Sequence, residues 1–330
     1  PRYLRMTRTP AKKTVLIRDV DANWYAEQFR THCPGYDFLP ATDNQTAMDH
    51  APEADIIIGL APVLNEQMIA SATRLQWVQA LTTGVDNLLA MQALKPEVAL
   101  TNCNGFHGPQ MSELAFLMML SLNRDAAKMA RNQESRTWER WPQTLLFNKT
   151  VTIIGVGVIA EDLATRCNAF GMKVIGVSDG RDSVPGFAQM FKRQALNKAV
   201  SGCDFLVVLT PYSPATHHII NADVFAAMPP HSILINISRG GCVDEAALLD
   251  ALKIEEIAAA GLDVFAKEPL EADNPLWTAP NVMITPHIGG MSDIYKQQAM
   301  PRVAENLNAF ATRGVYALTG LISRPDRSPS

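Results

Sequence analysis

Three side chains suited to acid–base chemistry follow three short apolar runs late in the chain. Arg239 lies in NISRGGCVDEAALL, Glu268 in GLDVFAKEPL and His287 in TPHIGG. An arginine can hold a carboxylate through two parallel hydrogen bonds, and a histidine can transfer a proton close to neutral pH. Each residue alone has an ordinary explanation: a surface arginine, a solvated glutamate or a structural histidine. Together, and behind the glycine motif described next, they indicate an acid–base site.

A glycine motif precedes these residues in VTIIGVGVIAEDLA, at positions 151–164. Residues 151–154 are β-branched and predict a short buried strand. Gly155 and Gly157 let the chain turn tightly and approach a bound group, and Ala160 is small enough for close packing between helix and strand. The helix that follows would point its N–H groups at an anion, for which a pyrophosphate is the usual choice. The flanking strand and helix favour a dinucleotide site over a plain glycine-rich turn.

The chain as a whole alternates short β-rich runs with helical stretches, which is typical of parallel sheets covered on both faces. The predicted strands are residues 15–17, 56–58, 77–79, 151–154, 174–177, 205–209, 233–235, 260–263 and 282–284. The segment before the glycine motif is long enough for a separate α/β unit. We therefore predict two doubly wound parallel-sheet domains, Rossmann-like and flavodoxin-like, with a ligand cleft between them.

Helical patterns also suggest how the two domains are joined. Residues 110–131 predict one long helix with apolar residues at helical spacing, and this helix could bridge the domains. A last helix over residues 292–310 could return to the first domain. A shorter helix is predicted after Arg239, capped near Asp244.

The composition predicts a globular protein without general affinity for nucleic acids or membranes. The 330 residues are 47% hydrophobic, which supports a sizeable core, and the net charge of -4 gives no attraction to polyanions. No apolar run has the length of a membrane span. Five cysteines without a C-x-x-C pair are typical of reduced, buried thiols, so we expect a cytoplasmic location.

Metal and serine-hydrolase chemistry have no support in the motifs. His217 and His218 are adjacent, without a suitably spaced carboxylate or third histidine, and the sequence contains neither H-E-x-x-H nor G-x-S-x-G. We therefore expect no metal ion at the site.

Six motifs resemble, in their order and spacing, those of the D-isomer-specific 2-hydroxyacid dehydrogenases, a family that includes glyoxylate and hydroxypyruvate reductases. They are LQWVQALTTGVDNL, TNCNGFHGPQMSE, VTIIGVGVIA, INISRGGCVDEAALLDAL, GLDVFAKEPL and NVMITPHIGG. The resemblance implies NAD(P)-dependent interconversion of 2-keto acids and D-2-hydroxy acids. It also implies a dinucleotide-binding domain over residues 105–290, inserted into a discontinuous substrate domain over residues 1–104 and 291–330.

The resemblance assigns catalytic roles that agree with the chemistry of the three side chains. His287 would be the general acid in keto-acid reduction and the base in the reverse direction. Glu268 would hold the imidazolium, and this neighbouring carboxylate would raise the pKa of His287. Arg239 would bind the substrate carboxylate and polarise the keto oxygen, where negative charge develops.

Substrate binding and assembly are also implied by the resemblance. The backbone amides of Thr83, Gly84 and Val85 are similar to a second carboxylate clamp, although the residues alone favour an ordinary strand-to-helix turn. In some similar enzymes an aromatic near Trp138 or Trp141 reaches the site of a second subunit. This implies a homodimer, and a buried structural indole is the other interpretation. We expect small substrates such as glyoxylate, hydroxypyruvate or pyruvate.

The cofactor contacts implied by the resemblance spread along the second half of the chain. Val158 and Ile159 would present backbone N–H groups to the pyrophosphate. Asp263 would hold the carboxamide of the nicotinamide. The other residues expected to line the cofactor site are Gly155, Gly157, Thr210, Pro211, Ser238 and His287.

The choice between NAD and NADP depends on the end of the strand at residues 174–177. NAD-preferring relatives commonly have an acid where this chain has Ser178, which leaves room for a 2′-phosphate that Arg181 could meet. Asp179, one residue on, could instead accept hydrogen bonds from the ribose and would repel a phosphate. On this balance we expect NAD.

One function from another class stays open. Transcriptional co-repressors of this fold also retain the histidine, glutamate and arginine, and act as nucleotide-sensing binding proteins without significant turnover. The sequence shows no long interaction tail that would favour this role. Turnover of a 2-keto acid distinguishes the two functions.

Overall fold

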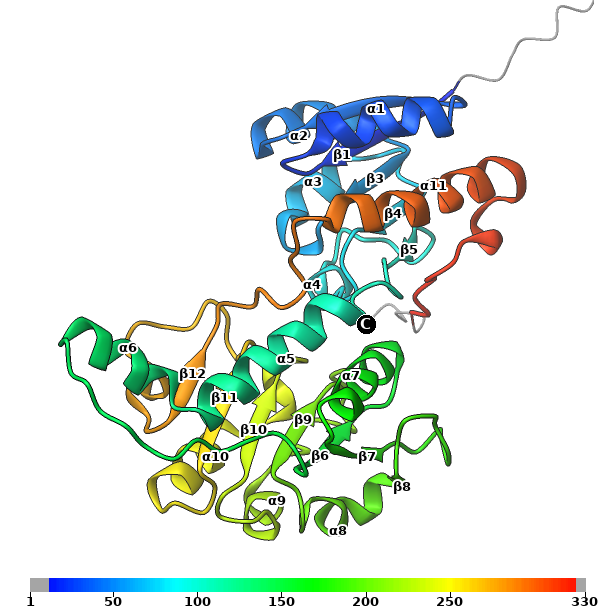
Figure 1. Cartoon of the computed structure of the whole chain (residues 1–330). Helices are drawn as coiled ribbons and strands as arrows, with labels where there is room; N and C mark the ends of the chain where they lie inside the picture. Colours follow the sequence, from blue (N-terminus) through cyan, green and yellow to red (C-terminus); the bar gives the residue numbers. More distant parts are fainter. Residues whose placement is uncertain (1–11, 325–330) are drawn as a thin grey trace, which may run out of the picture. The chain divides into compact units, whose positions relative to one another are not determined.

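The computed structural model describes residues 12–324. Within them the chain forms two compact units (Figure 1). The first unit contains the residues up to Phe106 and those from Asp293 onward, and the second unit runs from His107 to Ser292. The ends of the predicted substrate domain, before residue 12 and after residue 324, lie outside the described residues.

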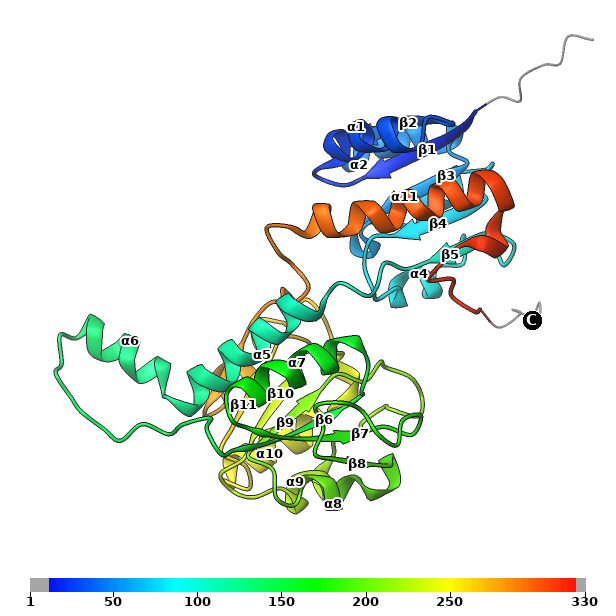
Figure 2. The same ribbon diagram turned by 45° about the vertical axis from the view of Figure 1, so that its right-hand side comes forward.

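The first unit is built on a five-stranded parallel sheet in the order β2-β1-β3-β4-β5. Its strands are β1 (Lys13–Arg18), β2 (Tyr36–Ala41), β3 (Ile56–Gly59), β4 (Trp77–Ala80) and β5 (Ala99–Thr101). Its helices are α1 (Ala22–His32), α2 (Asn44–His50), α3 (Glu66–Ser71), α4 (Asp86–Ala90) and α11 (Tyr295–Arg313). Helices α1 and α11 pack on one face of the sheet and α2, α3 and α4 on the other, so both faces are covered (Figure 2).

The last helix, α11, belongs to the first unit although it comes from the far end of the chain. The rings of Trp77 in β4 and Phe310 in α11 are 5.3 Å apart. The side-chain amide of Asn306, which is buried in α11, donates to Gln79 of β4 at 2.8 Å. The predicted return of this helix to the first domain is therefore confirmed.

The second unit is built on a seven-stranded parallel sheet in the order β12-β11-β10-β9-β6-β7-β8. Its strands are β6 (Thr150–Ile154), β7 (Lys173–Val177), β8 (Gln189–Phe191), β9 (Phe205–Val208), β10 (Ile233–Asn236), β11 (Ala259–Leu262) and β12 (Val282–Ile284). Its helices are α5 (Gly108–Asn123), α6 (Ala126–Glu134), α7 (Val158–Ala169), α8 (Leu196–Val200), α9 (Ala222–Ala227) and α10 (Glu245–Lys253). The strand order reverses between β6 and β9, as in doubly wound dinucleotide-binding folds. The predicted fold class, two parallel-sheet α/β domains, is confirmed.

The prediction of one helix over residues 110–131 is wrong. Helix α5 ends at Asn123, and a second helix, α6, begins at Ala126. Asp125 between them has a left-handed backbone with φ of 55°, and its side chain accepts a hydrogen bond from the Lys128 N–H at 3.1 Å. An aspartate tolerates this conformation and caps the new helix, so the chain bends without glycine or proline.

Helix α10 ends in a backbone conformation that favours glycine, yet Glu255 occupies the position. Its φ is 56°, and the N–H of Glu256 donates to the Ala251 carbonyl at 2.8 Å, which is the bonding of a helix end closed by a left-handed residue. We expect Glu255→Gly to raise the free energy of unfolding by about 1 kcal/mol, because glycine avoids the clash of Cβ in this region.

Chemical denaturation of the two proteins measures this difference. The matched control is Asp250→Gly at an exposed position inside α10, which should lower stability by about 0.3 kcal/mol because glycine is a slightly poorer helix former than aspartate. An unchanged or lowered stability of Glu255→Gly would show that Glu255 carries no backbone strain.

Candidate active site

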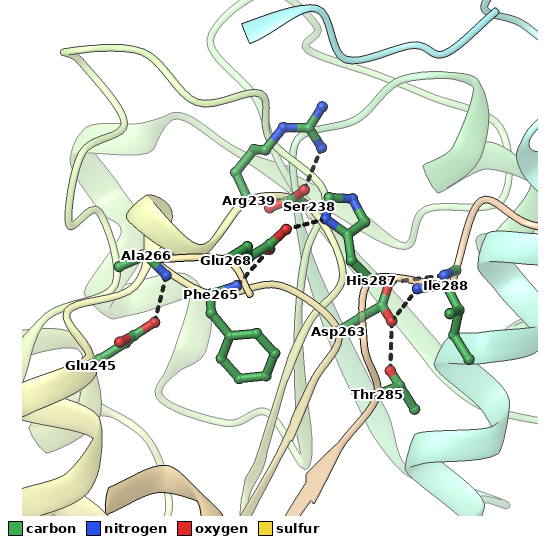
Figure 3. Close-up of polar contacts among 11 residues, drawn as sticks. Ser238, Arg239, Glu245, Asp263, Phe265, Ala266, Glu268, Thr285, His287 and Ile288 are labelled. Carbon is green, nitrogen blue, oxygen red and sulfur yellow. Dashed lines mark hydrogen bonds and ion pairs between the residues drawn. The ribbon is translucent and has the colours of Figure 1, made fainter. Parts of the chain in front are cut away.

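The three predicted catalytic side chains lie together at one edge of the second unit's sheet. Strands β10, β11 and β12 are parallel neighbours whose last residues are in register, with Asn236 beside Leu262 and Leu262 beside Ile284. Arg239, Glu268 and His287 follow these three strands, and Figure 3 shows their side chains gathered beyond the strand ends. Strand register thus assembles groups that are far apart in the sequence.

His287 and Glu268 form a close pair. The Nδ1 atom of His287 is 2.6 Å from Oε2 of Glu268, whose Oε1 accepts the backbone N–H of Phe265 at 2.9 Å (Figure 3). The hydrogen bond to Glu268 raises the pKa of His287, and burial and the nearby Arg239 oppose this only in part. Burial raises the pKa of Glu268, but the bonds from His287 and Phe265 outweigh it and lower that pKa on balance. The pair therefore favours a charged, proton-donating imidazole next to an ionised carboxylate.

The loop that carries His287 is fixed by Asp263, at the end of β11. The Asp263 side chain is almost fully buried and accepts three hydrogen bonds from this loop: the Thr285 hydroxyl at 2.6 Å and the N–H groups of Ile288 and Gly289 at 2.9 Å each. His287 itself has φ of 54°, which is uncommon for a residue with a side chain. Asp263 thus holds the backbone that aims the imidazole, a role that the sequence analysis did not assign to it.

Arg239 is positioned by the residues around it in the loop after β10. The amide of Asn236 donates to the Arg239 carbonyl at 3.0 Å, and the guanidinium Nη1 donates to the Ser238 carbonyl at 2.6 Å. The next residue, Gly240, lies against the loop that carries Glu268, since a Cβ at Gly240 would be 1.8 Å from the carbonyl carbon of Phe265. Only glycine permits this approach, so the arginine and glutamate loops are packed backbone to backbone.

A further residue, Glu245, ties the glutamate loop to a helix. Asp244 caps α10 as predicted, because its side chain accepts the N–H groups of Ala246 and Ala247 at 3.1 Å. The adjacent Glu245 accepts the N–H of Ala266 at 2.7 Å (Figure 3). No local sequence pattern marks Glu245, because only the fold brings it to residue 266.

The glycine turn between β6 and α7 has the shape of a phosphate cradle. Gly155 has φ of 88°, and a Cβ there would be 2.5 Å from the backbone nitrogen of Thr210 at the end of β9. Gly157 borders open space, and α7 begins at the next residue, Val158. Backbone N–H groups at the start of this twelve-residue helix, those of Val158 and Ile159 among them, would face a bound anion, since no side chain caps the helix. These residues fit the pyrophosphate of a dinucleotide.

The residues expected near the ribose lie at the end of β7, beside this turn. The N–H of Gly155 donates to the Val177 carbonyl at 3.1 Å, which brings Ser178 next to the glycines. Arg181, expected to meet a 2′-phosphate, is in an ion pair with Glu161 of α7. Asp179 is in an ion pair with Arg193, which the sequence analysis did not consider.

The turn proposed as a second carboxylate clamp belongs to the first unit. Thr83, Gly84 and Val85 connect β4 to α4, at the carboxyl end of the sheet. The Thr83 hydroxyl donates to the Cys103 carbonyl at 3.1 Å. The backbone carbonyl of Thr83 accepts a hydrogen bond from the side-chain amide of Asn102 at 2.9 Å. The turn is therefore held by the segment that follows β5.

In residues 12–324, no group of three or more histidine, cysteine, aspartate or glutamate side chains is arranged to hold a metal ion. Within the same residues, no helix combines the length and the apolar character needed to cross a bilayer. All five cysteines are free and buried, as predicted.

The chain is similar to proteins of known family. A sequence model described as D-isomer specific 2-hydroxyacid dehydrogenase, NAD binding domain, matches residues 116–289. A probable 2-ketogluconate reductase of Dictyostelium discoideum is 34% identical over 277 residues, which cover 82% of this chain and 83% of that protein. The chain spans about half the length, 52%, of a D-3-phosphoglycerate dehydrogenase of Mycobacterium tuberculosis that is 32% identical to it over 82% of this chain.

Solved structures agree with these matches. A D-isomer specific 2-hydroxyacid dehydrogenase family protein from Aeromonas salmonicida superposes with a TM-score of 0.88 at 33% identity, over 95% of this chain and 99% of that one. An NADPH-dependent glyoxylate/hydroxypyruvate reductase from Sinorhizobium meliloti, solved with NADP and sulfate, superposes with a TM-score of 0.79 at 26% identity, over 94% of this chain and 98% of that one.

Proposed function

Because the chain belongs to the D-isomer specific 2-hydroxyacid dehydrogenase family, we propose that it is an NAD(P)-dependent reductase of small 2-keto acids. Glyoxylate, hydroxypyruvate and pyruvate are the substrates of choice. The observation that carries the proposal is the 2.6 Å pairing of His287 with Glu268, in the same unit as the glycine turn. A histidine kept protonated by a carboxylate is the group that keto-acid reduction requires.

In this proposal His287 donates its proton to the C2 oxygen of the keto acid. Nδ1 is engaged by Glu268, so Nε2 is the atom that faces the substrate. Glu268 keeps the ring oriented and stabilises its positive charge before the proton leaves. In the oxidation of a hydroxy acid the same Nε2 atom removes the hydroxyl proton.

Arg239 binds the substrate carboxylate and stabilises the negative charge that develops on the keto oxygen. Its fixed fork of N–H donors matches a carboxylate better than a lysine ammonium does. The turn at Thr83, Gly84 and Val85 is proposed as the second clamp on the same carboxylate. This part of the proposal rests on the motif TTGVDNL and on the position of the turn at the carboxyl end of β4.

The cofactor is proposed to bind along the carboxyl edge of the second unit's sheet, where a bound nicotinamide would supply the hydride. The glycine turn and the first N–H groups of α7 would hold its pyrophosphate. A carboxylate oxygen can accept two hydrogen bonds, so Oδ2 of Asp263 can bind a carboxamide as well as the N–H of Gly289. Thr210, Pro211 and Ser238 are proposed to line the same site. We propose NAD as the preferred cofactor, because Asp179 can accept from ribose hydroxyls.

We also propose a cytoplasmic homodimer. Five free, buried thiols suit a reducing compartment. Helix α6 has no buried residue, and Trp138 beyond it is 87% exposed, which excludes a structural indole there. Together with Met129, Leu145 and Phe147, which are also exposed, this segment offers apolar surface for a second copy of the chain.

The direct test is the loss of reduced-nicotinamide absorbance with NADH and NADPH in parallel. The panel should contain glyoxylate, hydroxypyruvate, pyruvate and bulkier branched and aromatic 2-keto acids. Turnover of a small 2-keto acid to the D-2-hydroxy acid supports the proposal. Cofactor binding without turnover across the panel would instead favour a nucleotide-sensing binding protein.

The role of Glu268 predicts a shift in pH dependence. In the reductive direction activity requires protonated His287, so the rate falls as the pH rises through the pKa of His287. Glu268 raises that pKa. In Glu268→Gln the carboxylate charge is lost, the pKa of His287 drops, and the fall in kcat/KM should occur at lower pH than in the wild type.

The matched control is Glu271→Gln, three residues along, because Glu271 pairs with Lys267 at the surface. Its pH profile should coincide with that of the wild type. A Glu268→Gln profile that keeps the wild-type midpoint would contradict the assignment of Glu268.

A further inference from the structure

Asp179 occupies the place where dinucleotide-binding folds distinguish the two nicotinamide cofactors. It lies just past the end of β7, and β7 is bonded to the glycine turn through Gly155. In such folds the residue at the end of the second strand contacts the 2′-hydroxyl of NAD, or an arginine nearby accepts the 2′-phosphate of NADP. The surroundings of Asp179 therefore decide which cofactor fits.

Both oxygens of the Asp179 carboxylate are bonded to one neighbour, Arg193, and each keeps a further acceptor position. Its Oδ1 accepts the backbone N–H of Arg193 at 2.9 Å, and its Oδ2 is 2.6 Å from the guanidinium Nη2. The other end of the guanidinium donates to the Ala215 carbonyl at 3.0 Å. Lys192 adds a further cation, with its ammonium 2.9 Å from the Asp179 carbonyl and 2.6 Å from Asp182. The Arg193 bonds lower the pKa of Asp179, so this carboxylate stays ionised.

This pair lines an open hollow of about 900 Å³ that also includes Lys192, His217 and His218. A guanidinium and a backbone N–H directed at one point, with an ammonium close by, are donors from which proteins build phosphate sites. Here a carboxylate of the chain itself takes up the guanidinium and the backbone N–H. Arg181 is less suited to a phosphate, since it is paired with Glu161 on α7.

We propose that the Asp179–Arg193 pair sets the cofactor specificity of this protein. The Asp179 carboxylate occupies the site of a 2′-phosphate and holds Arg193 there, so that the site accepts the ribose hydroxyls of NAD and repels NADP. Arg193, assisted by Lys192, is the latent phosphate-binding group, and Arg181 is not. The proposal rests on the proposed function only in requiring that the glycine turn binds a nicotinamide dinucleotide.

The test measures dissociation constants for NADH and NADPH by titration calorimetry, without any 2-keto acid. The wild type should bind NADH more tightly. In Asp179→Asn, which keeps the shape and removes the charge, the ratio of the two constants should move towards NADPH by about 10- to 100-fold, as expected when a charged repulsion is replaced by charge-assisted hydrogen bonds. Adding Arg193→Ala to this variant should abolish the gain.

The matched control adds Arg181→Ala to Asp179→Asn, and this double variant should keep the gain for NADPH. Titration with 2′,5′-ADP and with 5′-AMP, which differ only in the 2′-phosphate, isolates the adenosine end. The ratio of their dissociation constants should rank the variants in the same order. A gain that survives Arg193→Ala, or is lost with Arg181→Ala, or is absent in Asp179→Asn overturns the proposal. If the wild type and all variants bind neither NADH nor NADPH while remaining folded by circular dichroism, the proposed function fails and this inference fails with it.

Discussion

Replacing His287 by asparagine should lower kcat by about two to four orders of magnitude in both directions of the reaction, because the proposed general acid and base is lost. Asparagine suits the test because it tolerates the left-handed backbone that His287 adopts, at φ of 54°. The loop fixed by Asp263 should therefore keep its shape. Initial rates with a small 2-keto acid at saturating cofactor measure the effect.

Two further measurements separate chemistry from binding in this variant. The dissociation constant for reduced nicotinamide should stay within a factor of about three of the wild type, since the asparagine removes a proton donor and leaves the glycine turn intact. The control is His231→Ala. His231 lies just before β10, at the amino ends of the strands, and its imidazole is 3.1 Å from Asp204. That variant should turn over normally. Near-normal turnover of His287→Asn would falsify the role of His287.

Replacing Arg239 by lysine should lower kcat/KM by about 10²- to 10³-fold, although the positive charge is kept. A lysine ammonium lacks the planar fork, so it cannot bind the carboxylate and reach the keto oxygen in the same geometry. Arg239→Ala should lose more, with both a higher KM and a lower kcat. Steady-state kinetics over a range of keto-acid concentrations separate the two constants.

Free guanidinium offers a decisive control for the arginine. Added to Arg239→Ala it should restore part of the activity, because it can occupy the space left by the side chain and stabilise the same negative charge. It should leave Arg239→Lys unchanged, since the lysine fills that space. If Arg239→Lys retains wild-type kcat/KM, the arginine has no bidentate contact with substrate.

The interior of both sheets was predictable, and their edges were less so. All nine predicted strands are present, and the three that were missed, β2, β5 and β8, are edge strands. An edge strand is paired on one side only and tolerates residues that a central strand excludes: β2 contains Pro40 and Asp37. Strands β5 and β8 have three residues each, too few for a periodic pattern.

The helix break at Asp125 was missed for a related reason. Its signal is a single side chain that caps the next helix, and the apolar pattern around it continues without glycine or proline. Sequence periodicity reports which face is buried, and α6 has no buried face. Periodicity therefore could not separate α6 from α5, and only the capping side chain marks the break.

The candidate site was predictable where a residue follows a strand and hidden where a residue acts through the fold. The clustering of Arg239, Glu268 and His287 could be predicted because the carboxyl ends of parallel strands lie at the same end of a sheet. Glu245 and Arg193 act on Ala266 and Asp179, which lie 21 and 14 positions away in the sequence. No local pattern marks such partners. The second role of Asp263 was hidden in the same way, because its donors lie on the loop after the next strand.

The contact of Gly240 with the backbone of Phe265 limits how this protein can be re-engineered. No side chain fits between the two segments, so the position of the loop after β10 depends on that of the loop after β11, and the reverse. In a chimaera that takes only one of these loops from a relative with a different substrate preference, the grafted loop would not fit the backbone of the other. Substrate scope should therefore be transferable between relatives only when both loops are grafted as a pair.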